Sequence, residues 1–271
     1  MNPRPRLSVA LTPCPNDTFV IGAVVTGKLR FEPADIAVEL HDIEHLNEAA
    51  LAGRYDVVKI SCATYAGIAG DYTVLDTGAA VADGYGPMML ARDTFDRNSI
   101  RAAKVVAPGA HTTAALLYRL WAGPDAPLAF APYDEIIERV ASGEFDAGVI
   151  IHESRFTYRE LGLGRVIDLG AWWRDATGRP LALGCYVMRS ELHARYGVAF
   201  DDLLRVAMAR AARGDEDIER YIRAHAQELD ERVIRQHIGL YVNDYTRHLG
   251  AAGHDAVRYL AARCAELDAA P

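Results

Sequence analysis

A short pattern occurs twice in the chain and constrains the fold more than any other feature. Residues 51–60 read LAGRYDVVKI and residues 141–150 read ASGEFDAGVI. Both copies contain a glycine typical of a helix end, an aromatic residue followed by aspartate, and a run suited to a buried strand. A strand-then-helix pattern precedes each copy. Repeated α/β units of this kind predict two similar α/β lobes.

Polar residues follow the predicted strand in each copy. Ser61 and Cys62 follow the first strand, and His152 follows the second in the stretch GVIIHESR at 148–155. Ligands of open α/β sheets bind beyond the carboxyl ends of strands, so the two strand ends predict a cleft between the lobes. A histidine there can carry a proton near neutral pH. The simpler alternative is that His152 only caps its strand.

The loop 12–18 (TPCPNDT) joins the first predicted strand, Leu7 to Leu11, to a helix over 19–26. Its prolines stiffen the turn, and either Asn16 or Asp17 is a suitable N-cap for that helix. A rigid strand-to-helix turn explains the prolines and one polar residue. The clustering of several polar residues favours a loop that lines the ligand cleft.

The loop 108–113 (PGAHTT) precedes a helix over 113–121. Unpaired N–H groups at a helix start, beside the hydroxyls of Thr112 and Thr113, suit a carboxylate or a phosphate. A threonine N-cap explains one of the two threonines equally well. Both interpretations stay open at this point.

The division into lobes follows from the predicted strands. We expect lobe one to comprise 1–88 and 190–271, and lobe two to comprise 89–189. The strand 181–188 is expected beside the strand 87–91, which gives a two-stranded hinge. Residues 190–270 read as helices, with caps or breaks near four positions: Gly197, Gly214, Asp230 and Gly250.

Several other clusters have simpler structural interpretations. A polar group near the start of the chain lacks the HExxH spacing of a zinc site, so we expect no metal: His41, Asp42, Glu44 and His45. Trp172 and Trp173 are expected to pack, with a contact to a flat ligand ring as the alternative. The histidines of the C-terminal helices are taken as surface or core residues: His225, His237, His248 and His254.

Composition excludes some classes of partner. The 271-residue chain has a net charge of -8, which argues against a nucleic-acid or membrane-surface binder. No uncharged apolar stretch is long enough to span a bilayer, and Leu7 to Leu11 is too short for a secretory signal. The cysteines are far apart and are expected to be reduced thiols: Cys14, Cys62, Cys185 and Cys264. We expect a cytoplasmic protein.

Six stretches together resemble the 1,4-dihydroxy-6-naphthoate synthases of the futalosine route to menaquinone. They run in order through nearly the whole chain: TPCPNDTF (12–19), LNEAALAGRYDVVKIS (46–61), PGAHTTA (108–114), GVIIHESRFTY (148–158), LGAWW (169–173) and RAHAQEL (223–229). The resemblance implies a type II periplasmic-binding-protein-like fold, with two α/β lobes around a ligand cleft. It also implies a carbon–carbon lyase that acts on cyclic dehypoxanthinyl futalosine.

The resemblance also assigns residues. It implies that His152 is the general base, that Lys59, Ile60 and Ser61 bind substrate from lobe one, and that Thr112 and Thr113 bind it from lobe two. Asn16 and Asp17 are added as substrate-binding candidates from the polar loop. A small-molecule substrate is the implied partner, no metal or redox cofactor is expected, and the chain is expected to be a monomer or a homodimer.

Two other functions are compatible with the same fold. A solute-binding protein would trap its ligand without reaction, but such proteins are normally exported and no export signal is expected here. A sensing module of a transcription regulator would need an attached DNA-binding element, and the C-terminal helices lack a basic stripe. The motifs favour the lyase, because functional sites rather than folds determine activity.

Overall fold

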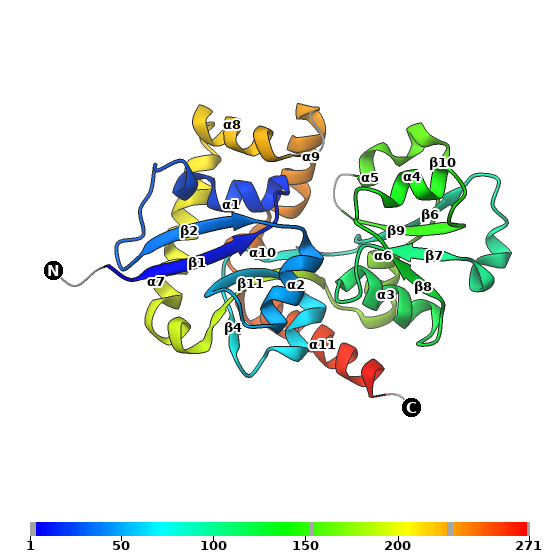
Figure 1. The fold of residues 1–271 in the computed structure, drawn as a ribbon, viewed down its shortest axis with the longest axis horizontal. Coiled ribbons are helices and arrows are strands. Elements are labelled where there is room, and N and C mark those ends of the chain that lie inside the picture. The colour runs from blue at the N-terminus through cyan, green and yellow to red at the C-terminus, as the bar shows by residue number, and fades with distance from the viewer. Residues whose placement is uncertain (1–3, 152–153, 227–229, 270–271) are drawn as a thin grey trace.

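Two α/β lobes lie side by side in the computed structural model, which describes residues 4–151, 154–226 and 230–269 (Figure 1). The sheet of lobe one contains β1 (Arg6–Leu11), β2 (Asp35–Leu40), β3 (Val57–Ser61), β4 (Tyr72–Val74), β5 (Ala80–Ala82) and β11 (Leu181–Arg189). The sheet of lobe two contains β6 (Met88–Arg92), β7 (Val105–Ala107), β8 (Leu128–Phe130), β9 (Ala147–Ile150) and β10 (Leu163–Asp168).

The two sheets share one strand plan. The first has the order β2-β1-β3-β11-β4, with β5 beside β11, and the second has the order β8-β7-β9-β6-β10. In each sheet the first three strands of that order are parallel and the remaining pairs are antiparallel. The strands of the repeated sequence pattern, β3 and β9, therefore occupy equivalent places. The prediction of two similar α/β lobes is confirmed.

The chain leaves the first sheet after β5, enters the second at β6, and returns through α6 (Leu169–Thr177) to β11. The expected pairing of 181–188 with 87–91 is wrong, because β11 pairs with β3, β4 and β5, whereas β6 pairs with β9 and β10. Residues 181–189 therefore lie in the sheet of lobe one, although the expected division placed them in lobe two. The reason is that β11 is buried over almost its whole length and fits the middle of a sheet.

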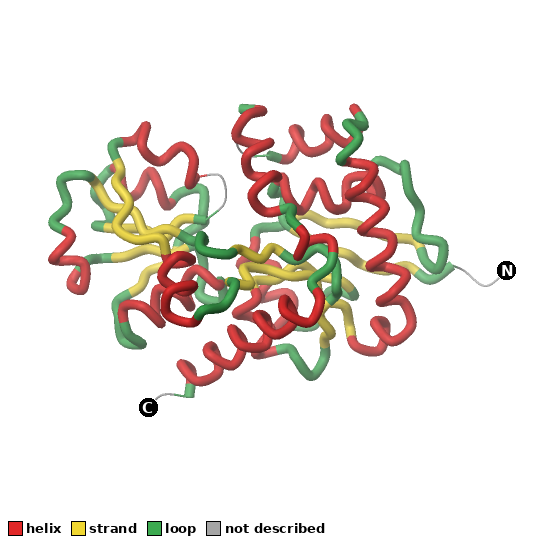
Figure 2. The backbone as a smooth tube through the Cα atoms, turned by 180° about the vertical axis from the view of Figure 1, so that it is seen from behind, coloured by secondary structure: helices red, strands yellow, loops and turns green. Residues whose placement is uncertain are grey.

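Helices cover both faces of the first sheet, as the view from behind shows (Figure 2). On one face, α1 (Pro15–Val25) packs against α7 (Ser190–Ala211), α8 (Glu216–His225) and α9 (Glu231–Tyr241). On the other face lie α2 (Ile43–Leu51), the 3-10 helix η1 (Cys62–Gly67) and α11 (Gly250–Asp268). The remaining helical elements are α3 (Thr113–Ala122), α4 (Ile136–Ala141), α5 (Ser154–Thr157), α10 (Asp244–Arg247), η2 (Arg97–Ala102) and η3 (Tyr158–Leu161).

Three of the four expected breaks in the C-terminal helices are present. Gly214 separates α7 from α8, Asp230 is the N-cap of α9, and Gly250 is the first residue of α11. The break expected at Gly197 is wrong, since α7 continues through this buried glycine. Among the described residues, no helix is long and apolar enough to cross a membrane.

Candidate functional site

A cavity lies between the carboxyl ends of strands from the two lobes. Lobe one contributes Thr12, Asn16, Asp17, Ile43, Lys59, Ser61, Ala80, Leu183, Gly184, His237 and Tyr241 to its lining. Pro87, which precedes β6, and four residues of lobe two complete it: Thr112, Thr113, Ala114 and Ile151. The cavity is where the repeated strands β3 and β9 end, as the sequence predicts.

A buried ion pair forms one wall of the cavity. Lys59 on β3 and Asp17 on α1 have side chains that are only 4% and 2% exposed, and Lys59 Nζ lies 2.9 Å from Asp17 Oδ1. Lys59 Nζ also donates to the carbonyl oxygen of Gly78 at 2.9 Å and lies 4.8 Å from the centre of the Tyr186 ring. Desolvating two charges is expensive, so a buried pair is weak evidence for stability. A fixed cation beside a cavity is, however, suited to holding an anionic or polar ligand.

Two polar residues near the start of α1 donate hydrogen bonds to Asp17. Thr12 Oγ1 donates to Asp17 Oδ2 at 2.6 Å, and Asn16 Nδ2 donates to Asp17 Oδ1 at 3.0 Å. The helix begins at Pro15 with Cys14 as its N-cap, so the expected capping role of Asn16 or Asp17 is wrong. Proline suits the first helical turn because its missing N–H would have no partner there. The earlier helix start turns Asp17 toward Lys59 instead.

His237 and Tyr241 on α9 extend the same wall. His237 is 1% exposed, and its Nε2 lies 2.8 Å from Asn16 Oδ1. The rings of His237 and Tyr241 lie 4.7 Å apart. Burial raises the pKa of Tyr241, so its hydroxyl stays protonated near neutral pH.

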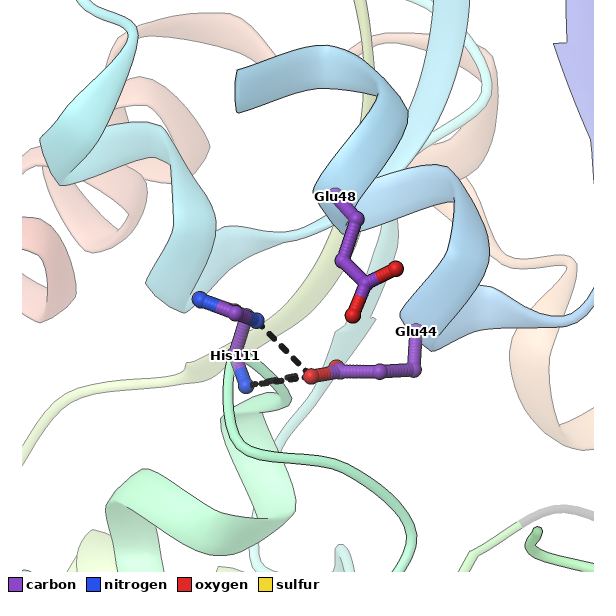
Figure 3. Close-up of side chains that lie close together, drawn as sticks. All are labelled: Glu44, Glu48 and His111. Atoms are coloured by element: carbon purple, nitrogen blue, oxygen red, sulfur yellow. Dashed lines mark hydrogen bonds and ion pairs between the residues drawn. The ribbon is translucent and has the colours of Figure 1, made fainter. Parts of the chain in front are cut away.

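Ser61 is connected to lobe two through a line of hydrogen bonds. Asn47 on α2 accepts from the Ser61 backbone N–H at 2.8 Å and donates to Ser61 Oγ at 3.1 Å. Asn47 also donates to Glu44 Oε2 at 3.2 Å. Glu44 in turn accepts from the backbone N–H of His111, at 3.0 Å, and lies 2.7 Å from His111 Nδ1 (Figure 3). This line joins the end of β3 to the loop that begins α3.

Glu48 lies beside the contact between Glu44 and His111 (Figure 3). These three side chains offer possible metal-ligand atoms within 4.8 Å of one another. Hydrogen bonding alone explains why Glu44 and His111 meet. In the group considered in the sequence, the rings of His41 and His45 lie 4.6 Å apart. His41 Nε2, however, pairs with Glu39 at 3.1 Å, and the Glu44 carboxylate turns to the other lobe.

Thr112 and Thr113 both lie at the start of α3 and are buried. Thr112 is the N-cap, because its Oγ1 accepts from the Ala115 N–H at 3.1 Å and donates to the Gly109 carbonyl at 2.8 Å. Thr113 Oγ1 crosses to lobe one, where it donates to the Leu183 carbonyl at 2.8 Å and accepts from the Ala63 N–H at 3.3 Å. The N-cap interpretation is confirmed for Thr112. The amides of a helix start, which have no intrahelical partner, remain suited to an anion.

Ile60 does not line the cavity. It alternates with Lys59 and Ser61 on β3, so its side chain faces the opposite side of the sheet and belongs to a core cluster with Val58 and Cys185. The resemblance assigns Ile60 to substrate binding, but only the backbone of Ile60 could serve that role, because its side chain faces away from the cavity. The other predicted binding residues line the cavity together.

His152, the predicted base, lies outside the described residues. Ile151 before it lines the cavity, and Arg155 after it is anchored in the protein. Arg155 Nη1 donates to the Gly86 carbonyl at 3.2 Å and to the Tyr241 hydroxyl at 3.4 Å, and Arg155 Nη2 lies 3.5 Å from Asp168 Oδ2.

Cysteines and tryptophans behave as structural residues. All four cysteines are thiols rather than halves of disulfides, as expected. Burial and a hydrogen bond with Cys185 raise the pKa of Cys62 well above its ordinary value, which disfavours the thiolate needed for a nucleophile. Trp173 is buried, donates to the Pro180 carbonyl at 3.4 Å, and packs edge-on against Tyr259. Neither Trp173 nor Trp172 lines the cavity, so packing is confirmed for Trp173.

Sequence reasoning missed His237 and Tyr241 as cavity residues. They are spaced four apart and follow Val233 at the same spacing on α9, so all three share one buried helix face. Such a stripe is typical of core packing, and the sequence carries no signal that separates the two cases. Asn47 does not line the cavity but holds Ser61, and it was missed for the same reason, because it lies on the buried face of α2.

Comparisons with known proteins identify the family of this chain. A family model described as menaquinone biosynthesis matches residues 7–266. A protein of Thermus thermophilus named 1,4-dihydroxy-6-naphtoate synthase is 42% identical over 94% of this chain and 92% of its own length. A protein of Streptomyces coelicolor with the same name is 40% identical over 96% of this chain and 93% of its own length. The chain belongs to this menaquinone-biosynthesis family of 1,4-dihydroxy-6-naphthoate synthases.

Similar solved structures identify the fold of the chain. A crystal structure of a protein from Archaeoglobus fulgidus is 34% identical and superimposes with a TM-score of 0.88, covering 96% of this chain and 97% of that one. The periplasmic aliphatic sulphonate binding protein of Escherichia coli is only 13% identical, with a TM-score of 0.68 over 98% of this chain and 88% of that one. This synthase-family member therefore has a periplasmic-binding-protein-like α/β fold, as expected.

Proposed function

We propose that the protein is a carbon–carbon lyase that converts cyclic dehypoxanthinyl futalosine to 1,4-dihydroxy-6-naphthoate. Membership of the synthase family supports this reaction. The protein would act on this small molecule in the cytoplasm, as a monomer or a homodimer, without nucleic acid or membrane partners.

The observation that carries the proposal is the chemistry of the cavity between the lobes. A buried cation, Lys59, and a serine face it from lobe one, and the start of α3 faces it from lobe two. A substrate with a carboxylate at one end and sugar-derived hydroxyls at the other matches polar groups at opposite walls with apolar residues between them.

In the proposed complex, the start of α3 holds the substrate carboxylate. The helix N-terminus carries a partial positive charge, and Thr113 and Ala114 both line the cavity. Lys59 and Ser61 then face the sugar-derived part. Contacts from both lobes fix the scissile bond relative to the base.

His152 is the proposed general base, and Ile151 beside it already lines the cavity. The neutral imidazole takes a proton from a hydroxyl of the sugar-derived part. The oxygen electron pair forms a carbonyl as the carbon–carbon bond breaks, and the pair from that bond passes to the ring system, which takes up a proton and becomes aromatic. The atoms of the substrate are divided between the two products, so no oxidant or reductant is consumed.

The decisive experiment measures turnover of purified protein in excess cyclic dehypoxanthinyl futalosine, with a chelator present and both products quantified by mass spectrometry. We expect many equivalents of 1,4-dihydroxy-6-naphthoate per protein and an equal amount of the sugar-derived fragment. We expect H152Q to bind substrate but to lose at least about hundredfold in kcat, because a general base contributes roughly 10² to 10⁴ in rate.

The pH profile tests the role of His152 as the base independently of whether the protein is a lyase. For the wild type, kcat/KM should fall as the pH drops below the range near 6.5 where a histidine gains its proton. Substrate that is bound but never converted would make the protein a solute-binding or sensing module. Equal turnover by H152Q would keep the lyase and remove His152 from the role of base.

A further inference from the structure

His237 is a buried polar residue of the cavity that no step above uses. It is 1% exposed, it lies on α9, and it reaches the first turn of α1 from the C-terminal part of the chain. Burying an imidazole costs free energy unless its nitrogens are hydrogen-bonded. Its position beside the Asp17–Lys59 pair indicates a function in the site.

The hydrogen bonds around Asp17 determine which way each polar group points. Asp17, paired with the Lys59 cation, is a carboxylate and can only accept, so the group that Asn16 turns to it at 3.0 Å must be its NH₂. The Asn16 carbonyl oxygen therefore faces His237 Nε2, at 2.8 Å. An amide oxygen also only accepts, and Nε2 must consequently carry the proton in this contact.

We propose that His237 is a positioning residue for the substrate cavity: its Nε2–H holds the Asn16 amide, which in turn holds Asp17 and its partner Lys59. This inference rests on the proposed function, in which Lys59 binds the substrate. The resulting line of hydrogen bonds runs from α9 through the start of α1 to β3.

A donor at this point is needed because the Asn16 amide can rotate by a half turn. The rotated amide would place its oxygen against the Asp17 carboxylate, which repels it, and its NH₂ against the Nε2–H of His237. Both hydrogen bonds of the Asn16 side chain would then be lost. The Nε2–H of His237 prevents that rotation. Because Asp17 Oδ1 accepts from both Asn16 and Lys59, a displaced Asn16 also displaces the cation.

The test compares two replacements of His237. Glutamine carries an N–H at a similar reach and should keep the Asn16 contact, whereas leucine removes the donor. We expect H237L to lose about tenfold in kcat/KM, mainly through KM, which corresponds to one lost hydrogen bond in a polar network. We expect H237Q to stay within about threefold of the wild type.

A double-mutant cycle with Asn16 shows whether His237 acts through that residue. In the N16A background, H237L should cost no more than about twofold further, because the partner is already missing. Full activity of H237L, equal losses in H237Q and H237L, or additive losses in the double variant would each overturn the proposal. Thermal unfolding of every variant identifies losses that come from destabilisation alone.

A second measurement does not require turnover, so it tests the role of His237 even if the proposed lyase activity is absent. Nitrogen-15 spectra of the histidine rings in the wild type, with H237Q used for assignment, report which nitrogen carries the proton. We expect a protonated Nε2 in the wild type and a weakened preference in N16A. An Nε2 without a proton would overturn the proposal, whereas absence of lyase activity in the wild type would overturn only the function.

Discussion

Single residues set the charge of the site. Lys59 occupies a strand position between apolar neighbours where a charged side chain is rare, and its ammonium is compensated by Asp17 and by the Gly78 carbonyl. Replacing a buried pair with uncharged residues is often neutral or stabilising, whereas removing one partner is strongly destabilising. The pair therefore makes sense as a way to hold a cation at a ligand site.

We predict that D17N lowers the free energy of unfolding by about 3 kcal/mol, because it leaves Lys59 buried without its counter-charge. The double variant K59M/D17N removes both charges and should recover at least about half of that loss. Urea unfolding measures both values. K59M/D17N should nevertheless lose about hundredfold in kcat/KM, as expected when a preorganised charge is removed from a site. A stable double variant with wild-type kcat/KM would show that the pair serves the fold and not the reaction.

Elements bring the two lobes together at the cavity. The helix α2 supplies Glu44, and the loop before α3 supplies His111, so these two side chains form a contact between the lobes (Figure 3). Asn47 links this contact to Ser61, and His111 precedes Thr112 in the chain. The close approach depends on a glycine. A Cβ atom at Gly109 would lie 2.4 Å from Glu44 Cδ, well inside van der Waals contact.

We predict that G109A displaces Glu44, removes its hydrogen bonds to His111, and raises KM by roughly tenfold, since about 1 kcal/mol is lost for each bond between the lobes. Steady-state kinetics measures this change. G123A is the matched control, because Gly123 also has a positive φ, 112°, but a Cβ atom there meets nothing within 4 Å. In an E44A background the loss should shrink to the backbone strain of an alanine at the positive φ of Gly109, 157°. A loss there as large as that of G109A alone would contradict the steric explanation.

Much of this arrangement could be predicted from local sequence. The repeat of 51–60 at 141–150 gives equivalent strands β3 and β9, and the polar residues after strand ends give most of the polar part of the cavity lining. The place of β11 could not be predicted, because an apolar strand fits the middle of either sheet. His237 could not be identified as a cavity residue either, since only tertiary structure brings α9 to Asn16.

For the whole molecule, the fold alone does not determine the function. The same two-lobe architecture occurs in proteins that bind a solute without reaction, and the sulphonate binding protein of Escherichia coli is one example. What distinguishes a lyase is a base and a substrate held by both lobes in a site that excludes water. The part-buried contact from Thr113 to lobe one and the exposed contact from Glu44 to lobe two join the two walls.

The most direct measurement is a crystal structure of H152Q with cyclic dehypoxanthinyl futalosine at a concentration that saturates binding. We predict ordered substrate in the cavity between the lobes, with its carboxylate at the start of α3 and its sugar-derived hydroxyls near Lys59 and Ser61. Substrate bound at another place, or an empty cavity at saturation, would contradict the site and with it the proposed reaction.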